Sequence, residues 1–85
     1  MPYIGQGARL HLEPALRELF KTSLGLGDIN YVITKAILNY LEAMGRNYHS
    51  YASVVGMLDT IKNELYRREI NGYEEEKCMQ NGDVY

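Results

Sequence analysis

Two short polar pairs in this sequence have residue types suited to holding an anion. Tyr31 and Lys35 lie four residues apart, so they share one face if the segment is helical. Arg67 and Arg68 are adjacent, and their guanidinium groups carry forked donors that match the oxygens of phosphate or carboxylate. An aromatic ring beside such donors could hold the base and the phosphates of a nucleotide. These four residues are the candidate ligand site.

A structural interpretation of the same residues is the stronger one. Arg67 and Arg68 could pair with the run Glu74 to Glu76 in the same chain, and the tyrosines could rim an interface. Carboxylates of the chain are always present, whereas a ligand is conjecture. We therefore expect these arginines to hold the acidic run, and we keep the anion site as the alternative.

Metal chemistry and covalent catalysis have less support. Glu74 to Glu76 and Asp83 could hold magnesium for nucleotide hydrolysis, but the sequence lacks the paired Glu-x-x-Glu spacing that would make carboxylates converge on an ion. His11, His49 and Cys78 show no zinc-ligand spacing, and Cys78 has acidic neighbours that disfavour a thiolate. We expect a solvated acidic loop, no metal, no cofactor and no catalytic residue.

The composition is that of an ordinary folded domain. The 85 residues are 46% hydrophobic and 24% charged, and the net charge of −2 gives no reason to bind nucleic acid. One cysteine cannot form an internal disulfide, and no run of 18 apolar residues suggests a membrane span. The sequence therefore predicts a single cytoplasmic domain. Eight tyrosines with no tryptophan favour surfaces that are partly dry, such as interfaces.

The chain begins with an expected arm and a short helix. Residues 1–11 contain Pro2 and two glycines without a helical period, which is typical of an extended segment. A helix should follow from residue 12 to about Ser23, with Pro14 in its first turn, where a missing amide hydrogen has no consequence.

The second helix has the most regular pattern. Asp28 can cap it, so it should begin near Ile29, and Gly45 should end it with a left-handed residue. Apolar residues recur at steps of three and four between these limits. Tyr31 and Leu38 form a second, narrower apolar strip, which predicts that this helix is covered from two sides.

The third helix should open near Asn47 or Ser50 and end at Asn71 and Gly72. Its interior contains Gly56, which would let another backbone approach closely. Its inward face should consist of Tyr51, Val54, Val55, Leu58, Ile61 and Leu65, with Tyr66 as a further candidate.

The remaining residues, 73–85, are interpreted as an ordered tail. Asn81 and Gly82 can turn the chain so that Val84 and Tyr85 bury apolar area against the second and third helices. Tyr73 would anchor the start of this tail. The prediction is thus an all-α bundle of three helices, with an arm (1–11), a helical body (12–72) and a tail (73–85) in one domain.

Five separated motifs resemble a family of short bacterial and phage proteins of unknown function. They are "MPYI", "GDINY", "NELYRR", "YEEEK" and the terminal "NGDVY", and they extend over essentially the whole chain. The resemblance implies that the tail belongs to the fold, and it brings no known activity. One departure is Gly72, which stands where the family pattern has a proline.

Taken together, these observations predict a non-enzymatic accessory protein that assembles as a homodimer or higher oligomer through its second and third helices. Leu38, Gly56, Tyr73, Val84 and Tyr85 are the expected interface and tail-anchor residues. The alternative is a protein that sequesters a nucleotide or another small anion in an intersubunit pocket, and a metal-dependent nucleotide hydrolase ranks third.

Overall fold

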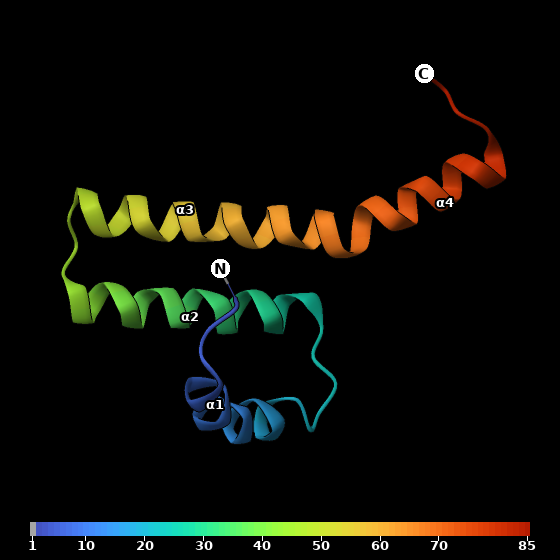
Figure 1. The fold of residues 1–85 in the computed structure, drawn as a ribbon. Coiled ribbons are helices and arrows are strands. Elements are labelled where there is room, and N and C mark those ends of the chain that lie inside the picture. The colour runs from blue at the N-terminus through green and yellow to red at the C-terminus, as the bar shows by residue number, and fades with distance from the viewer. Residues whose placement is uncertain (1) are drawn as a thin grey trace. The chain divides into compact units, whose positions relative to one another are not determined.

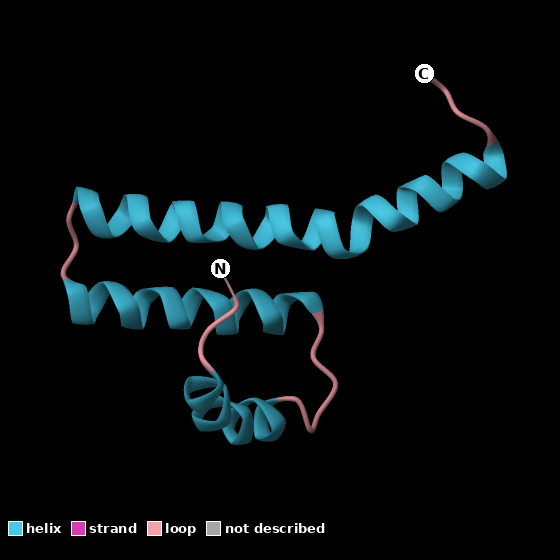
Figure 2. Cartoon of the chain, in the orientation of Figure 1, coloured by secondary structure: helices cyan, strands magenta, loops and turns pink. Residues whose placement is uncertain are grey.

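The computed structural model describes residues 2–85, and in this range the chain is helical with no strand (Figures 1 and 2), which confirms the predicted all-α class. Met1, the first residue of the expected arm, lies outside the described residues. The helices are α1 (Gln6–Leu19), α2 (Leu26–Met44), α3 (Tyr48–Leu65), the π-helical turn η1 (Tyr66–Ile70) and α4 (Asn71–Asn81). The chain divides into two units, residues 2–54 and 55–85.

The N-terminal arm is shorter than predicted. Helix α1 begins at Gln6, so only residues 2–5 are extended, and Pro14 lies inside the helix instead of in its first turn. Two local contacts support this early start: the Arg9 N–H donates to Gly5 O at 3.1 Å, and Arg9 Nε donates to Ile4 O at 2.8 Å. Residues 8–13 include several good helix formers, so a helix that starts at these contacts continues through them to Pro14. Apolar periodicity alone does not indicate such an early start.

Helix α2 begins one turn before the predicted residue. Gly25 is its N-cap and Asp28 is the third helical residue, where the carboxylate Oδ2 accepts the Gly25 N–H at 2.9 Å. Asp28 therefore stabilises the helix start as expected, from inside the first turn and not from the cap position. At the other end, Gly45 has a φ of +89° and stops the helix after Met44, as predicted.

The buried residues of the unit 2–54 lie on the last turn of α2 and the first turns of α3, on either side of the connecting turn. Asn47 opens α3, because its Oδ1 accepts the Ser50 N–H at 3.0 Å. Leu41, Ser50 and Val54 are buried, and they are the only buried residues among those described. The buried residues of the unit 2–54 are therefore confined to the region around this turn.

The segment 66–81 differs most from the prediction. Asn71 and Gly72 do not end the helix, because α3 passes through η1 into α4, and the acidic run lies on a helix and not on a loop. Gly72 keeps an ordinary helical backbone, since positive φ is found only at Gly45 and Gly82 among the described residues. Glu, Lys, Met and Gln after Gly72 favour helix strongly enough to outweigh one glycine. Figure 1 shows that the helix axis turns at η1.

Candidate functional site

Tyr31 and Lys35 lie one turn apart on α2, as the sequence predicted. The Lys35 Nζ lies 5.7 Å from the centroid of the Tyr31 ring, within the range of a cation–π contact. The Tyr31 side chain is exposed. The pair thus presents an aromatic face and an ammonium group to solvent.

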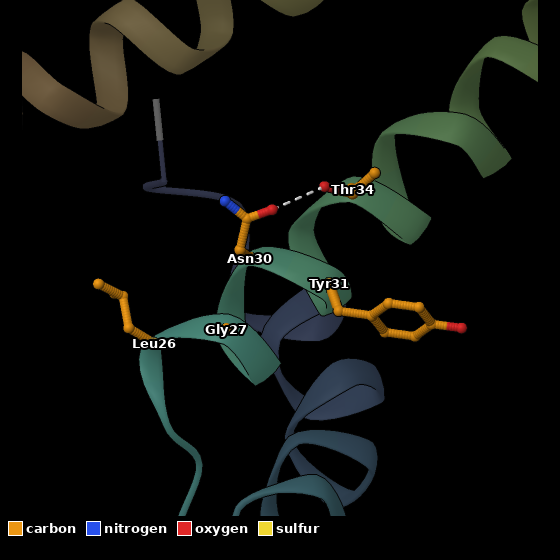
Figure 3. A pocket seen from close by; sticks show the side chains of 5 residues that line it. All are labelled: Leu26, Gly27, Asn30, Tyr31 and Thr34. Atoms are coloured by element: carbon orange, nitrogen blue, oxygen red, sulfur yellow. Dashed lines mark hydrogen bonds between the residues drawn. The ribbon is translucent and has the colours of Figure 1, made fainter.

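An open depression on the first turns of α2 includes Tyr31 (Figure 3). It is lined by Leu26, Gly27, Asn30, Tyr31 and Thr34. The Thr34 hydroxyl donates to Asn30 Oδ1 at 3.2 Å, whereas the Leu26 and Tyr31 side chains point away from each other. One helix supplies every wall, so the depression cannot enclose a ligand by itself.

Arg67 and Arg68 lie on the π-helical turn and do not hold the acidic run. The Arg67 Nε pairs with Glu64 Oε1 at 2.5 Å, and the Arg68 Nε lies 4.0 Å from the same oxygen. The predicted pairing with Glu74 to Glu76 is therefore wrong. The reason is sequence spacing. Glu64 precedes Arg67 by three residues and Arg68 by four, and side chains at these spacings are neighbours on a helix.

The candidate anion residues fall in different units. Tyr31 and Lys35 belong to residues 2–54, and Arg67 and Arg68 belong to residues 55–85. Tyr31 and Lys35 are therefore neighbours within one unit, and Arg67 and Arg68 are neighbours within the other. A second tyrosine and lysine form the same contact on α4, where the Lys77 Nζ lies 5.5 Å from the Tyr73 centroid.

The acidic residues make no metal site within the described chain. No group of three or more His, Cys, Asp and Glu side chains in residues 2–85 is placed to share an ion. Glu74, Glu75 and Glu76 are exposed on α4, and Glu76 Oε1 accepts a hydrogen bond from Gln80 at 3.3 Å. The Asp83 carboxylate accepts the Tyr85 N–H at 2.8 Å beyond the helix end.

The tail does not bury its last residues. Helix α4 ends at Asn81, and Gly82 caps it with a φ of +90°; residues 82–85 have no regular structure. The following residues border a depression with Cys78 on the last turns of α4, but Val84 and Tyr85 remain fully exposed. The expected packing of these two side chains on the second and third helices is absent from the single chain, and Tyr73 is exposed on α4.

Gly56 and Leu38 have open surroundings. A Cβ added at Gly56 would meet nothing within 4 Å, so no backbone approaches it closely in the single chain, contrary to the prediction. Leu38 is exposed on α2. Both residues stay candidates for an interface with another chain.

The amount of exposed apolar surface is a further feature of the chain, and the sequence motifs did not predict it. Most large apolar side chains are exposed, including Leu58, Ile61 and Leu65 on α3, which the sequence placed on the inward face of a bundle. Of the predicted inward face of the third helix, only Val54 is buried, so the expectation of a covered face is not met within the described chain.

Comparisons with known proteins assign a family and no activity. A family model described as Domain of unknown function (DUF6899) matches residues 1–84, and the chain belongs to that family. Searches of curated proteins and of solved structures give no significant match.

Proposed function

We propose that this member of the DUF6899 family is a non-enzymatic binding protein that works as a homo-oligomer held together by helix–helix contacts. Its role would be that of an accessory protein acting on a partner and not on a substrate. The phage or mobile-element origin and the cytoplasmic location belong to the same proposal. Their support is the motif resemblance and the single cysteine.

The observation that carries the proposal is the exposure of large apolar side chains within each unit. Ile33 and Leu38 on α2 are exposed in residues 2–54, and Leu58, Ile61 and Leu65 on α3 are exposed in residues 55–85. In a homo-oligomer, a second copy of the chain would contribute apolar surface of the same kind to cover them.

The chemical nature of the exposed surface supports the same conclusion. Monomeric proteins seldom expose large contiguous apolar patches. Here Leu, Ile, Val, Met and Tyr side chains are exposed on α2 and α3 alike. None of the helices described is both long and apolar enough to cross a membrane.

The test is the mass of the full chain in solution. Size-exclusion chromatography with light scattering at micromolar concentration should give at least twice the 9.8 kDa chain mass. A mass of one chain over the whole accessible concentration range would refute the proposal.

A second candidate, sequestration of a nucleotide or other small anion, is favoured by one observation. Lys35 lies over the exposed Tyr31 ring beside the depression on α2. A second subunit would have to supply the missing walls. Against this candidate, the same contact recurs at Lys77 and Tyr73, where it is an ordinary pair across one helical turn.

A thermal-shift series separates these two interpretations of Lys35. Nucleotide binding should raise the melting temperature by mass action, and Lys35→Ala should remove that increase. Lys77→Ala is the matched control and should preserve it. No increase at millimolar nucleotide would count against the anion site while leaving self-association untouched.

A further inference from the structure

The unit 55–85 contains the pair Asn-Gly twice, at Asn71–Gly72 and at Asn81–Gly82. An asparagine followed by glycine can lose its side-chain amide without an enzyme, because glycine has no Cβ to hinder the approach of its backbone nitrogen. Both asparagine side chains are exposed, and a Cβ added at either glycine would meet nothing within 4 Å. Residue type and exposure therefore do not distinguish the two pairs, and the backbone decides which of them reacts.

The reaction is deamidation through a cyclic imide. The glycine nitrogen bonds to the side-chain carbonyl carbon of the asparagine, the C–N bond of the amide breaks, and ammonia leaves with the proton of the glycine nitrogen. Water then opens the succinimide ring at either carbonyl, which gives aspartate or isoaspartate. Ring closure requires that the glycine N–H leaves its hydrogen bond and that the asparagine ψ leaves the helical range.

The first pair lies within a continuous helical path. Asn71 has a φ of −61° and a ψ of −41°, and its own N–H donates to Tyr66 O. The path continues on both sides of Asn71, through η1 before it and α4 after it. Release of the Gly72 nitrogen therefore requires opening of the helix in its middle, where neighbouring turns hold the backbone cooperatively.

The second pair lies where the helical path ends. Asn81 is the last residue of α4, and Gly82 has left the helix with a φ of 90° and a ψ of 148°. The Gly82 N–H donates to Cys78 O at 2.8 Å. The following residues have no regular structure, so fraying of the last turn releases the Gly82 nitrogen while the rest of α4 stays intact.

We propose that Asn81 is a deamidation site of the folded protein and that the helix protects Asn71 from the same reaction. The inference is independent of self-association, because it depends only on the local backbone within the unit 55–85.

The reaction would change the end of α4. Conversion of Asn81 to aspartate places a negative charge at the negative end of the helix dipole, two residues before Asp83. Conversion to isoaspartate instead inserts an additional carbon into the backbone at the helix end. The last turn of α4 should therefore be less stable in chains that have reacted.

Mass spectrometry of the full chain measures both sites in one experiment. The folded protein is incubated in mildly alkaline buffer, and a second sample is incubated in the same buffer with guanidinium chloride. Trypsin cleaves after Arg68 and Lys77, which puts Asn71 and Asn81 in separate peptides. Each deamidated peptide is heavier by the difference between an acid and an amide. The ratio of the denatured rate to the folded rate gives the protection of each site and removes the influence of its neighbours in sequence.

The protection of Asn71 should exceed that of Asn81 by roughly tenfold or more, because a helix interior opens far less often than a fraying end. Equal protection of the two sites would overturn the inference. An Asn81 that reacts only in denaturant would overturn it as well.

Glutamine variants assign each mass change to its residue. Asn81→Gln should abolish deamidation at position 81, because the longer side chain has to close a larger and less favoured ring, and it should leave the rate at Asn71 unchanged. Asn71→Gln is the matched control and should leave the rate at Asn81 unchanged. A mass change at position 81 that persists in Asn81→Gln would refute the assignment.

Discussion

At the scale of single residues, backbone conformation separates the glycines into two groups. Gly45 and Gly82 have positive φ and end α2 and α4, where a side chain would be strained. Gly56 has the backbone of a helix interior and open space around the position of a Cβ. The same residue type therefore stabilises a helix end in one place and weakens a helix interior in the other.

Alanine substitutions should separate these two roles. Gly45→Ala should lower the free energy of unfolding by about 1 kcal/mol, because alanine is disfavoured at positive φ. Gly56→Ala should raise it by up to about 1 kcal/mol, because alanine is the better helix former. Urea denaturation at one fixed protein concentration measures both.

Two results would contradict this argument. Unchanged stability of Gly45→Ala would show that the turn after α2 can rearrange. Reduced stability of Gly56→Ala would show that another backbone approaches this residue in the assembled protein, as the sequence suggested.

At the scale of elements, α4 makes most of the C-terminal region a helix held by local contacts. Its acidic residues make local contacts along one helix, such as Gln80 with Glu76, and its tyrosine and lysine pair across one turn. The helix therefore needs no bond from Arg67 or Arg68 to the acidic run. Beyond Asn81 only residues 82–85 are left, and their last two side chains are exposed.

Removal of residues 83–85 should have little effect on stability. Val84 and Tyr85 bury no apolar area in the single chain, so their loss should change the melting temperature by less than about 2 °C, equivalent to a fraction of 1 kcal/mol. Thermal circular dichroism of the truncated and full chains measures this. Removal of residues 71–85, which deletes α4 as well, is the comparison that should lower the helical signal.

A large loss of stability after removal of only residues 83–85 would show that the tail is buried in the assembled protein. The exposed Val84 and Tyr85 would then pack on a neighbouring subunit.

At the scale of the whole molecule, the small amount of buried apolar surface limits the stability expected of the single chain. Three residues of the described chain are buried, and they gather at the hairpin between α2 and α3. A chain of 85 residues has little stability to spare even when it is compact. Association would supply the burial that the single chain lacks.

Folding coupled to dimer formation should make the melting temperature depend on concentration. Each tenfold increase in protein adds about 1.4 kcal/mol per dimer, which corresponds to a rise of roughly 4 °C for two chains of this length. Differential scanning calorimetry at three concentrations measures the slope. A melting temperature that is independent of concentration would indicate a folded monomer.

Local properties could be predicted from the sequence because they depend on residues a few positions apart. The all-α class and the end of α2 at Gly45 depend on helical periodicity and positive φ. The sequence left Asn47 and Ser50 as alternative caps of α3, and the hydrogen bond from the Ser50 N–H to Asn47 selects Asn47. The resemblance carried by the five motifs predicted an uncharacterised family, and the family model that matches residues 1–84 is one of unknown function.

Other properties were decided only by the tertiary structure, because they depend on competition between partners. Arg67 and Arg68 pair with Glu64, three and four residues earlier on the same helical path, and not with the acidic run that the sequence favoured. Gly72 resembled a helix stop, yet the helix formers after it outweighed one glycine. Periodicity identified an apolar face on α3, but it contains no information on whether the same chain has enough surface to cover that face. Within the unit 55–85, Leu58, Ile61 and Leu65 remain exposed.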